Sequence, residues 1–359
     1  MKKILFLFEN FKVGGSEIAL IKIANNLLHK YDITFLVLQD IGNAKTFLDP
    51  KIKIINVNNG NKGIKFGFIK VLKQIYFFNP EFIITSKPHL SVIYIFLFVK
   101  FKLIYREASN PDKSMLLNFK QRILNIFFDI VSCINKLICF RYIHLSNSIY
   151  RNSNCNFFNS PCIIPNFIEE PISLSDNLDV NKSDYLKILS IGRISDQKNY
   201  LPVLKALKEL KINNIKFEYK ICYGSISDLV LFNNIKKYIS VNNLTQEVIL
   251  IPFLKDPYEL LVDSNVFLSP STFEGMSTTL YTSLLFNKVN IASEYFKEEL
   301  GAYDVTFFNT NSYLDLYDKL FLVSKKIANN SIKSYNNSEL VKQKYSKNNI
   351  ISKWELILQ

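Results

Sequence analysis

Short apolar runs alternate with segments of helical apolar spacing through the N-terminal half of the chain. The continuous apolar run of Lys3–Phe8 predicts a buried strand. The segment Ser16–Lys30, whose apolar residues recur three and four positions apart, predicts a helix. The same patterns predict strands at Asp32–Leu38, Ile52–Val57, Glu81–Ser86 and Lys102–Glu107, and helices at Ile64–Phe78 and Met115–Phe140. This alternation indicates right-handed βαβ units on a parallel sheet.

A polar segment, Ser173–Asp184, interrupts the alternation and has the low hydrophobicity of an interdomain linker. The pattern then restarts, with strands predicted at Leu186–Arg193, Ile215–Gly224, Glu247–Phe253, Asn265–Ser271 and Val289–Ser293, and helices at Tyr200–Leu210, Ser277–Phe286 and Asn348–Leu358. We therefore expect an α/β chain with two Rossmann-like domains facing each other across a cleft, at residues 1–170 and 171–340, and a terminal helical segment at 341–359.

Charge narrows the class of partner only slightly. The 359 residues carry a formal net charge of +13 at pH 7, and the stretch from Lys62 to Arg141 holds most of the excess. Such a region favours nucleic acid, an anionic lipid surface or a phosphorylated substrate, and an ordinary solvated basic face remains the alternative. No recognised nucleic-acid-binding module accompanies the charge, so we expect no nucleic-acid partner.

Cysteine, histidine and hydropathy patterns point to a cytoplasmic protein without a metal site. The five cysteines have no metal-site or CxxC spacing and are expected to be reduced, and the three histidines form no ligand pattern. The N-terminal apolar run stops at Glu9 with no cleavage site after it. The most apolar segment, Ser91–Tyr105, contains Lys100 and Lys102 and is too short to span a bilayer. We expect a soluble or peripheral protein.

Glycines follow the first predicted strand and open the first helix. Gly14 and Gly15 let the backbone approach a ligand closely, and the free amides of a helix start favour an anion. The spacing is not the GxGxxG of dinucleotide-binding proteins. An ordinary strand-to-helix turn is an equal alternative.

A second motif, Gly192–Asn199, follows the first strand of the C-terminal half. Arg193 could bind one phosphate through its guanidinium and Lys198 another through its ammonium group, since both follow a strand end. A surface loop with ordinary cations is the alternative, and it explains less well why both cations lie where this fold presents ligands.

A third motif, Ser269–Thr278, places a carboxylate and a glycine directly before a helix. Glu274 could accept hydrogen bonds from sugar hydroxyls, and the amides after Gly275 could donate to a phosphate or a hydroxyl. The alternative is a capping carboxylate, which stabilises a helix start by about 0.3–1 kcal/mol.

In their order and spacing, these motifs resemble the retaining, family 4 type of GT-B glycosyltransferases (glycosyl transferases group 1), of the kind that builds cell-envelope and capsular polysaccharides. The resemblance covers nearly the whole chain and includes the Ile164–Asn166 tripeptide and the NKVNIAS segment of Asn287–Ser293. The segment Ser352–Leu358 resembles the family's terminal helix, which packs back on the first domain. The resemblance thus implies an N-terminal acceptor-binding domain and a C-terminal domain that binds a nucleotide sugar.

The resemblance also implies roles for individual residues. Arg193 and Lys198 match the pair that grips the donor diphosphate, and Glu274 matches the first carboxylate of the family's Glu-x7-Glu motif, which contacts the donor sugar. Gly14 and Gly15 match the loop near the diphosphate and the acceptor. The remaining implied donor-binding residues are Gly192, Gly275, Met276, Ser277, Thr278 and Thr282.

Two departures from the family pattern affect the site. Thr282 stands where the family has its second glutamate, which usually contacts the nucleotide ribose; a threonine offers a weaker, neutral hydrogen bond. A histidine common near the end of a first-domain strand is replaced by Arg106 and Glu107, which we assign to contact with donor or acceptor, an ordinary salt bridge being the equal alternative.

The resulting hypothesis is an enzyme of the EC 2.4 type, a retaining hexosyl- or N-acetylhexosaminyltransferase. It would use a nucleotide-sugar donor, with a UDP-sugar as the expected donor, and a glycan or lipid-linked acceptor, with no metal or other cofactor. It would work in the cytoplasm, with peripheral contact to the anionic inner face of the plasma membrane. The alternatives are a sugar-binding pseudoenzyme, suggested by Thr282, and a nucleotide-sugar epimerase, which shares the two-domain architecture.

Overall fold

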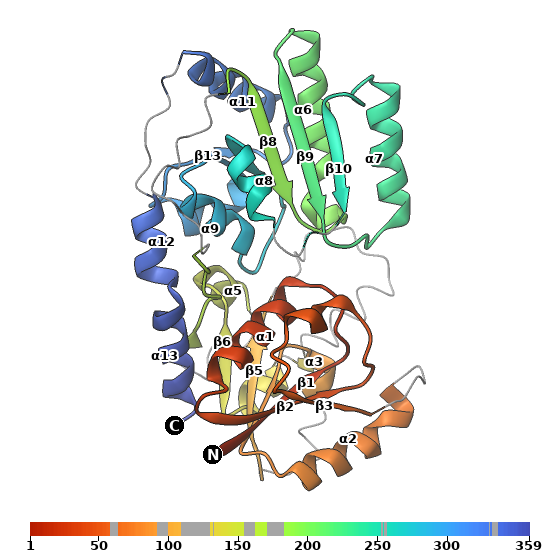
Figure 1. Cartoon of the computed structure of the whole chain (residues 1–359), viewed down its shortest axis with the longest axis vertical. Helices are drawn as coiled ribbons and strands as arrows, with labels where there is room; N and C mark the ends of the chain where they lie inside the picture. Colours follow the sequence, from red (N-terminus) through yellow and green to blue (C-terminus); the bar gives the residue numbers. More distant parts are fainter. Residues whose placement is uncertain are drawn as a thin grey trace. The chain divides into compact units, whose positions relative to one another are not determined.

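The chain forms two compact α/β units. The structure, a computed structural model, describes residues 1–57, 64–91, 100–108, 130–131, 133–153, 162–170, 183–252, 254, 257–329, 331 and 337–359. Unit 1 comprises Met1–Phe167 and Lys347–Gln359, and unit 2 comprises Ile168–Ser346 (Figure 1). Most of the predicted linker and of the predicted helix Met115–Phe140 lie outside the described residues.

Unit 1 contains a seven-stranded sheet with the order β3-β2-β1-β4-β5-β6-β7, in which every pair is parallel. Its strands are β1 (Lys2–Phe8), β2 (Tyr31–Val37), β3 (Lys53–Asn56), β4 (Phe82–Thr85), β5 (Lys102–Glu107), β6 (Arg141–His144) and β7 (Cys162–Ile163). Its helices are α1 (Gly15–Leu27), the 3-10 turn η1 (Asn43–Phe47), α2 (Ile64–Phe78), α3 (Pro88–Ser91), α5 (Asn147–Asn152) and α13 (Lys347–Ile357).

Both faces of this sheet are covered, which is why most residues of its central strands are apolar and buried. On one face Phe6 and Phe35 stack at 4.9 Å between ring centroids, in a cluster that also includes residues of α1. The C-terminal helix α13 joins the same cluster through the fully buried Trp354 and contacts α1. The other face packs against α2 through Val71 and Ile75. The predicted return of the terminal helix to the first domain is therefore confirmed.

Unit 2 contains a six-stranded parallel sheet with the order β10-β9-β8-β11-β12-β13. Its strands are β8 (Leu186–Ile191), β9 (Phe217–Tyr223), β10 (Val248–Pro252), β11 (Val266–Ser269), β12 (Val289–Ser293) and β13 (Val305–Phe308). Its helices are η4 (Asp196–Lys198), α6 (Tyr200–Ile212), α7 (Leu229–Val241), α8 (Tyr258–Asp263), α9 (Thr278–Leu285), η5 (Glu294–Phe296), α10 (Lys297–Leu300), α11 (Tyr313–Ala328) and α12 (Asn337–Tyr345).

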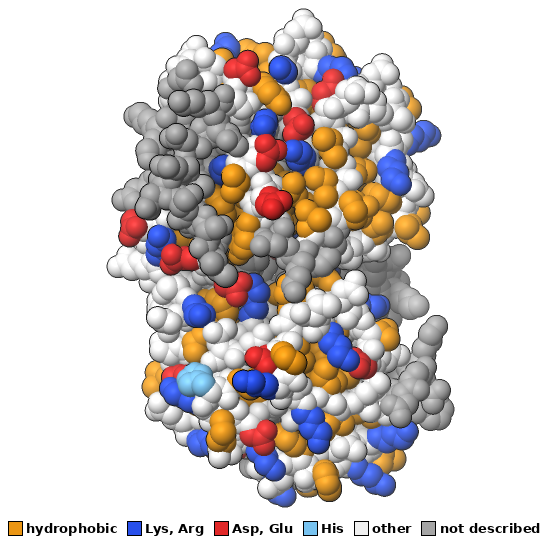
Figure 2. Space-filling view, in the orientation of Figure 1, with side chains coloured by type: hydrophobic (Ala, Val, Ile, Leu, Met, Phe, Trp, Pro, Cys, Tyr) orange, Lys and Arg blue, Asp and Glu red, His pale blue; other side chains and the backbone are white. Residues whose placement is uncertain are grey.

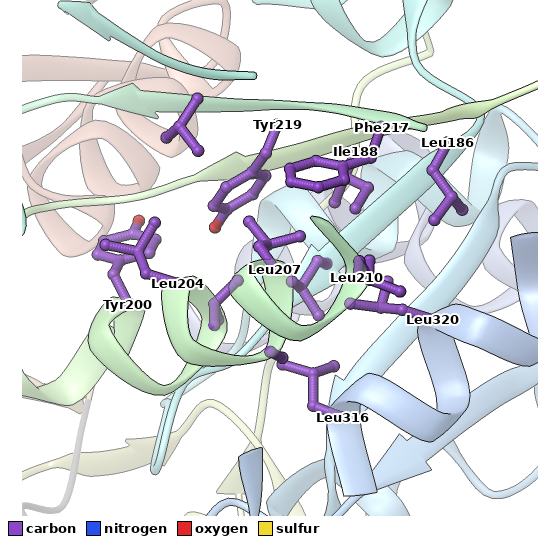
Figure 3. Close-up of a cluster of buried hydrophobic side chains, with 14 of the residues drawn as sticks. Leu186, Ile188, Tyr200, Leu204, Leu207, Leu210, Phe217, Tyr219, Leu316 and Leu320 are labelled. Carbon is purple, nitrogen blue, oxygen red and sulfur yellow. The ribbon is translucent and has the colours of Figure 1, made fainter. Parts of the chain in front are cut away.

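Leucines on two helices form the core on one face of this sheet. Leu204 and Leu207 of α6 pack toward Tyr219 of β9, while Leu316 and Leu320 of α11 approach the same cluster from a separate part of the chain (Figure 3). All five side chains are solvent-inaccessible. This packing fixes the position of α6, and with it the loop that precedes α6.

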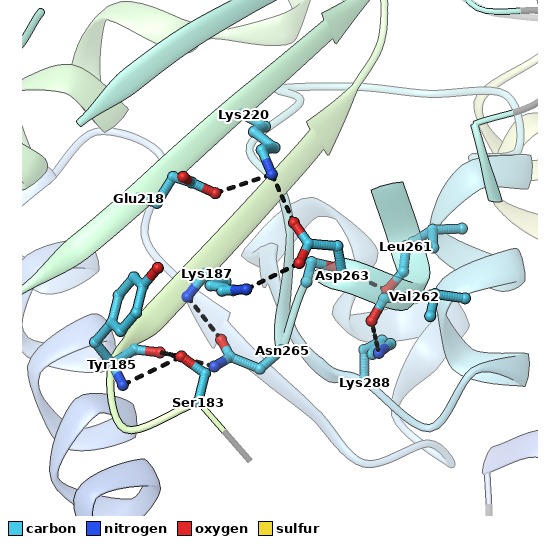
Figure 4. A network of polar contacts seen from close by, with 11 residues as sticks. Ser183, Tyr185, Lys187, Glu218, Lys220, Leu261, Val262, Asp263, Asn265 and Lys288 are labelled. Carbon is cyan, nitrogen blue, oxygen red and sulfur yellow. Dashed lines mark hydrogen bonds and ion pairs between the residues drawn. The ribbon is translucent and has the colours of Figure 1, made fainter. Parts of the chain in front are cut away.

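Charged side chains tie helix α8 to the amino ends of the strands. Asp263 receives hydrogen bonds from Lys187 Nζ at 2.8 Å and from Lys220 Nζ at 2.6 Å, and Lys220 also contacts Glu218 at 2.9 Å (Figure 4). The bonds from Lys187 and Lys220 lower the pKa of the Asp263 carboxyl. This network lies at the edge of the sheet opposite to the edge where parallel α/β domains bind ligands.

The cysteines correct one expectation. Cys133 takes part in a disulfide bond, whereas Cys139, Cys162 and Cys222 are free. Spacing along a sequence does not reveal which thiols meet in space, and so the expectation of five reduced cysteines was wrong for Cys133. The cysteines no longer argue for a reducing compartment, and a cytoplasmic location stays a prediction. Among the described residues, no helix is long and apolar enough to cross a membrane.

Candidate functional site

Two loops at the carboxyl edge of the unit 2 sheet contain the second and third motifs. Strands β8 and β11 are neighbours, so the loop after β8 and the loop after β11 lie side by side. One backbone and one side-chain hydrogen bond join them: Thr272 N donates to Gln197 O at 2.9 Å, and Gln197 Nε2 donates to Phe273 O at 2.6 Å. Gln197, which the sequence analysis did not select, thus holds the two motifs together.

Lys198 and Glu274 meet at this junction. Lys198 Nζ donates a hydrogen bond to Glu274 Oε1, and each side chain is only 13% exposed. Ser271 Oγ donates to the same Oε1 at 3.0 Å, and Tyr295 OH donates to the Glu274 carbonyl oxygen at 2.8 Å. The carboxylate and the ammonium group are therefore held close together at the carboxyl edge. Their contact with a donor stays a prediction.

Gly192 leaves room for the Lys198 side chain. A Cβ atom on Gly192 would lie 2.7 Å from Lys198 Cε and 3.1 Å from Nζ. Because real Cβ atoms do not approach carbon so closely, any larger residue would displace the lysine. A side chain at position 192 would therefore move the ammonium group of Lys198 from its present place.

Arg193 has a different environment from Lys198. Its side chain is exposed, and Nη2 donates to Gln197 Oε1 at 3.3 Å. The structure therefore does not join it to the Lys198–Glu274 pair. An exposed guanidinium held by one neutral partner can turn toward an arriving anion at small cost.

Helix α9 begins directly after the third motif. Gly275, Met276 and Ser277 are buried, and Thr278 N donates to Met276 O at 3.0 Å. One turn further on, Thr282 Oγ1 donates to Thr278 O at 2.8 Å. The hydroxyl proton at the position of the missing glutamate is thus used within the helix, and only the oxygen lone pairs remain for a ligand.

The first motif lies at the carboxyl edge of the unit 1 sheet. Gly14 is the N-cap of α1, and a Cβ atom there would clash with Glu17 Oε2. Glu17 pairs with Lys87 at 2.6 Å, and Ser16 Oγ donates to Ser86 Oγ at 2.9 Å. These contacts join the loop after β1 to the loop after β4, with open space beside Gly15.

Arg106, near the end of β5, is fully buried. Its Nη2 donates to Asn166 Oδ1, and among the described residues Nε and Nη1 have no hydrogen-bond partner. Burial lowers the pKa of the guanidinium to about 9. A partly paired buried guanidinium costs folding free energy, and its atoms are closed to solvent. Contact of Arg106 with a substrate stays a prediction.

Glu107, the last residue of β5, lies in a separate polar cluster with three residues that the sequence analysis did not select. Its Oε2 accepts a bond from Ser153 Oγ at 2.8 Å and lies 3.0 Å from His144 Nδ1. Lys136 Nζ donates to Ser153 Oγ at 2.7 Å. The described part of the chain contains no group of three or more His, Cys, Asp or Glu side chains that could hold a metal ion.

Comparison with known proteins agrees with this geometry. Residues 177–298 match the family model of the glycosyl transferases group 1, and this range includes both unit 2 motifs. An uncharacterized glycosyltransferase of Methanocaldococcus jannaschii is 24% identical over 243 residues, which span 63% of this chain and 58% of that protein.

Solved structures match over the whole chain. Anabaena HepE in complex with UDP and glucose has a TM-score of 0.78 at 17% identity, covering 100% of this chain and 99% of that one. Sucrose-phosphate synthase from Thermosynechococcus elongatus has a TM-score of 0.80 at 13% identity, covering 100% and 98%. The chain has the GT-B fold, with two parallel-sheet Rossmann-like domains, as the sequence predicts.

Within this GT-B chain, the family match falls on the unit that contains the Lys198–Glu274 pair. The pair is therefore the candidate functional site of unit 2.

Proposed function

We propose that this chain is a retaining glycosyltransferase that moves a hexosyl or N-acetylhexosaminyl group from a UDP-sugar to a glycan or lipid-linked acceptor. The observation that carries the proposal is the Lys198–Glu274 pair at the carboxyl edge of β8 and β11. A cation for the diphosphate and a carboxylate for sugar hydroxyls are already adjacent there.

Electrostatic stabilisation of the leaving group is the proposed mechanism. Lys198, the exposed Arg193 and the amides at the start of α9 would hold the diphosphate as its charge develops. Glu274 would accept hydrogen bonds from the sugar, and the acceptor hydroxyl would attack on the face from which the diphosphate leaves. Positive groups that are already close to the diphosphate need little reorganisation when its charge develops. No metal cofactor is part of this proposed mechanism.

The donor and acceptor classes are inferred from structural neighbours. HepE has been crystallised with UDP, with UDP and glucose, and with UDP-glucose, which favours a UDP-sugar here. A neighbour with a TM-score of 0.66 and 15% identity is the lipopolysaccharide outer core galactosyltransferase WaaB. This neighbour favours an acceptor of the cell envelope and a role in surface polysaccharide assembly.

Helix α2 supports peripheral contact with a membrane. It contains no acidic residue, and it exposes 87% of Phe77 and 66% of Ile69 next to the exposed Lys70 and Lys73. An apolar and basic helix face of this kind inserts shallowly into an anionic interface. On the face drawn in Figure 2, basic side chains are otherwise dispersed over both units. The basic residues Lys113, Lys120 and Arg122 lie outside the described residues.

Donor turnover tests the enzymatic proposal. We expect the chain to bind UDP and to release UDP from UDP-glucose, UDP-galactose or UDP-N-acetylglucosamine. Lys198→Ala and Arg193→Ala should each lower kcat/KM about 10- to 100-fold, because a charge-assisted bond to phosphate is lost. Lys187→Ala is the matched control, since Lys187 also pairs with a carboxylate but at the amino edge of the same sheet. Full turnover in both site variants would contradict the assignment, and UDP binding without turnover of any donor would favour the pseudoenzyme.

Vesicle co-sedimentation tests the membrane proposal. Binding should require anionic lipid, weaken as salt rises and fall when Phe77→Ser is combined with Lys70→Gln and Lys73→Gln. Val241→Ser on α7, which removes an apolar side chain of unit 2 that is 69% exposed, should leave binding unchanged. Equal recovery with neutral and anionic vesicles at low salt would refute the electrostatic part.

A further inference from the structure

The loop of the third motif lies between two other loops at the carboxyl edge of the unit 2 sheet. In the strand order, β11 has β8 on one side and β12 on the other, so the loop after β11 is flanked by the loops that follow these two strands. Each flanking loop contributes a side chain that bonds a carbonyl oxygen of the motif, Gln197 after β8 and Tyr295 after β12. The motif loop is therefore held from both sides.

The two side chains bond consecutive carbonyl oxygens. Gln197 Nε2 donates to Phe273 O at 2.6 Å. Tyr295 OH donates to Glu274 O at 2.8 Å. In a trans peptide unit the N–H of the following residue points opposite to the carbonyl, and no cis peptide bond occurs among the described residues. The N–H of Glu274 consequently points away from Gln197, and in the same way the N–H of Gly275 points away from Tyr295.

These two amides have no partner within the described part of the chain. Neither Glu274 N nor Gly275 N donates a hydrogen bond to another described residue, although Gly275 is buried. A buried amide without a partner is rare in folded proteins, because it has lost its hydrogen bonds to water and has gained none in return. The loop thus presents two fixed donors for an oxygen atom of a ligand.

The orientation of the Gln197 amide is set by its two partners. Its Oε1 accepts from Arg193 Nη2 at 3.3 Å, while Nε2 donates to Phe273 O. The reversed amide would place its NH2 group against the guanidinium donors and its oxygen against the carbonyl oxygen, and both contacts would be repulsive. Gln197 therefore connects the exposed arginine with the peptide unit that presents the Glu274 amide.

The β12 side of the loop is fixed by buried groups. The Tyr295 ring packs on the buried Phe296, with the ring centroids 5.4 Å apart, and this packing sets the direction of the hydroxyl. Ser293, the last residue of β12, donates from its Oγ to Ser271 O at 2.6 Å, and both serines are solvent-inaccessible. The motif loop is thus held at its start by Ser293 and at Glu274 by Tyr295.

We propose that Gln197 and Tyr295 are positioning residues of the donor site. They fix the amides of Glu274 and Gly275 in a direction in which both can donate to an oxygen atom of the nucleotide sugar. The inference rests on the proposed glycosyl transfer and deepens it. Because a peptide unit that is fixed beforehand loses little freedom on binding, the effect appears in donor affinity.

Calorimetry with UDP-glucose and with UDP tests the role of Tyr295. Tyr295→Phe removes the hydroxyl but keeps the ring on Phe296, and it should raise the UDP-glucose dissociation constant roughly three- to tenfold. A matching rise for UDP assigns the oxygen to the diphosphate, and an effect on UDP-glucose alone assigns it to the sugar. The control is Tyr219→Phe, which removes a hydroxyl that donates to Ser190 Oγ at 2.9 Å in the core of the same unit and should leave both constants unchanged.

Two outcomes of this experiment have different meanings. Equal UDP-glucose dissociation constants in the parent and in Tyr295→Phe would overturn the inference, whatever the effect on the thermal midpoint. Absence of UDP and UDP-glucose binding by the parent would instead overturn the proposed function.

A double-variant cycle tests the role of Gln197. Gln197→Met has a similar size and no charge, and it removes the bonds to both Arg193 and Phe273. It should weaken UDP-glucose binding in the parent and again in the Arg193→Ala background, because the bond to Phe273 O does not depend on the arginine. Loss of the effect in that background would show that Gln197 acts through Arg193 alone and would overturn its positioning of the motif loop.

Isotopic labelling of glycine for NMR gives a readout that does not depend on turnover. The chain has only ten glycines, and Gly275→Ala identifies the Gly275 resonance. Saturating UDP-glucose should move the Gly275 amide proton of the parent downfield, as the N–H gains an acceptor, and should move it less in Tyr295→Phe. A Gly275 amide that does not respond in the parent, or responds equally in both proteins, would overturn the inference even though UDP-glucose is bound.

Discussion

Lys198 Nζ donates a hydrogen bond to Glu274 Oε1, and the two residues come from loops that follow neighbouring strands of one parallel sheet. The pair is 76 residues apart in the chain. Parallel pairing of β8 with β11 makes this contact possible, because it brings the carboxyl ends of both strands to the same place. A cation and a carboxylate are therefore in position before a donor arrives.

Removal of the Glu274 carboxylate should damage turnover more than removal of the Thr282 hydroxyl. Glu274→Ala leaves Lys198 without its described partner and removes the proposed sugar contact, so we expect a loss of about 1.5–3 kcal/mol in transition-state stabilisation. Thr282→Ala removes a hydroxyl that bonds its own helix and should cost less than tenfold. The measurement is kcat/KM for UDP-sugar hydrolysis. Full activity of Glu274→Ala would show that the motif assignment is wrong.

Gly192→Ala should weaken UDP binding without changing any charge. The new Cβ would lie within 3.1 Å of three Lys198 side-chain atoms and would push the ammonium group out of place. We expect about a tenfold rise in the UDP dissociation constant, measured by calorimetry. The control is the double variant with Lys198→Ala, because an effect that acts through Lys198 disappears when the lysine is already absent. Additive losses would show that Gly192 acts through another group.

Thr282→Glu should tighten UDP binding if a carboxylate at this position reaches the ribose. The position lies one turn into α9, and the present hydroxyl proton is bonded to Thr278 O. A charge-assisted bond to a ribose hydroxyl would favour binding by roughly three- to tenfold. Thr282→Gln introduces a side chain of nearly the same size as glutamate but without its charge. Comparison of the two variants therefore separates the effect of charge from the effect of size. No gain with glutamate would contradict a ribose contact at this position.

The strands that the sequence predicts well are those buried on both faces. The predicted Val289–Ser293 and Lys102–Glu107 coincide with β12 and β5, because each contains short apolar groups of the length typical of a buried strand. No element was predicted for β7, whose two residues are too few to show a period, or for β6 and β13. Helix α11 was also missed, although Leu316, Leu320, Val323 and Ile327 lie on one helical face.

The candidate site was predictable only in part. Parallel α/β domains bind ligands at the carboxyl ends of their strands, and this rule places Lys198 and Glu274 at the same edge of the sheet. It does not predict their contact, because the sequence does not reveal which strands are neighbours. Arg106 and Glu107 are adjacent on β5, and the alternation of a strand separates them into a fully buried guanidinium and a partly exposed carboxylate. His144 gave no signal in the sequence, and only the parallel register of β5 with β6 places it opposite Glu107.

The ammonium group of Lys288 should cost stability at neutral pH, because it is almost fully buried in unit 2. Its side chain is 2% exposed, its Nζ donates to Val262 O at 3.0 Å, and burial lowers its pKa from 10.5 to about 8. Below pH 8 the lysine is charged in both the folded and the unfolded chain, so the whole desolvation cost is present in the fold. Between pH 8 and 10.5 the unfolded chain binds more protons than the folded one, and this contribution to stability therefore rises with pH.

Lys288→Met should consequently raise the midpoint of thermal unfolding at pH 7 and lose that advantage as the pH rises toward 10.5. The full shift corresponds to about 3 kcal/mol, and the loss of the hydrogen bond from Lys288 Nζ to Val262 O offsets about 1 kcal/mol of it. For a unit of this size, the net gain amounts to roughly 4–8 °C. Lys205→Met on the exposed face of α6 removes the same formal charge and should show no such pH dependence. If the difference between Lys288→Met and the parent were constant from pH 7 to 10, the lysine would be charged in the fold throughout and the burial argument would fail.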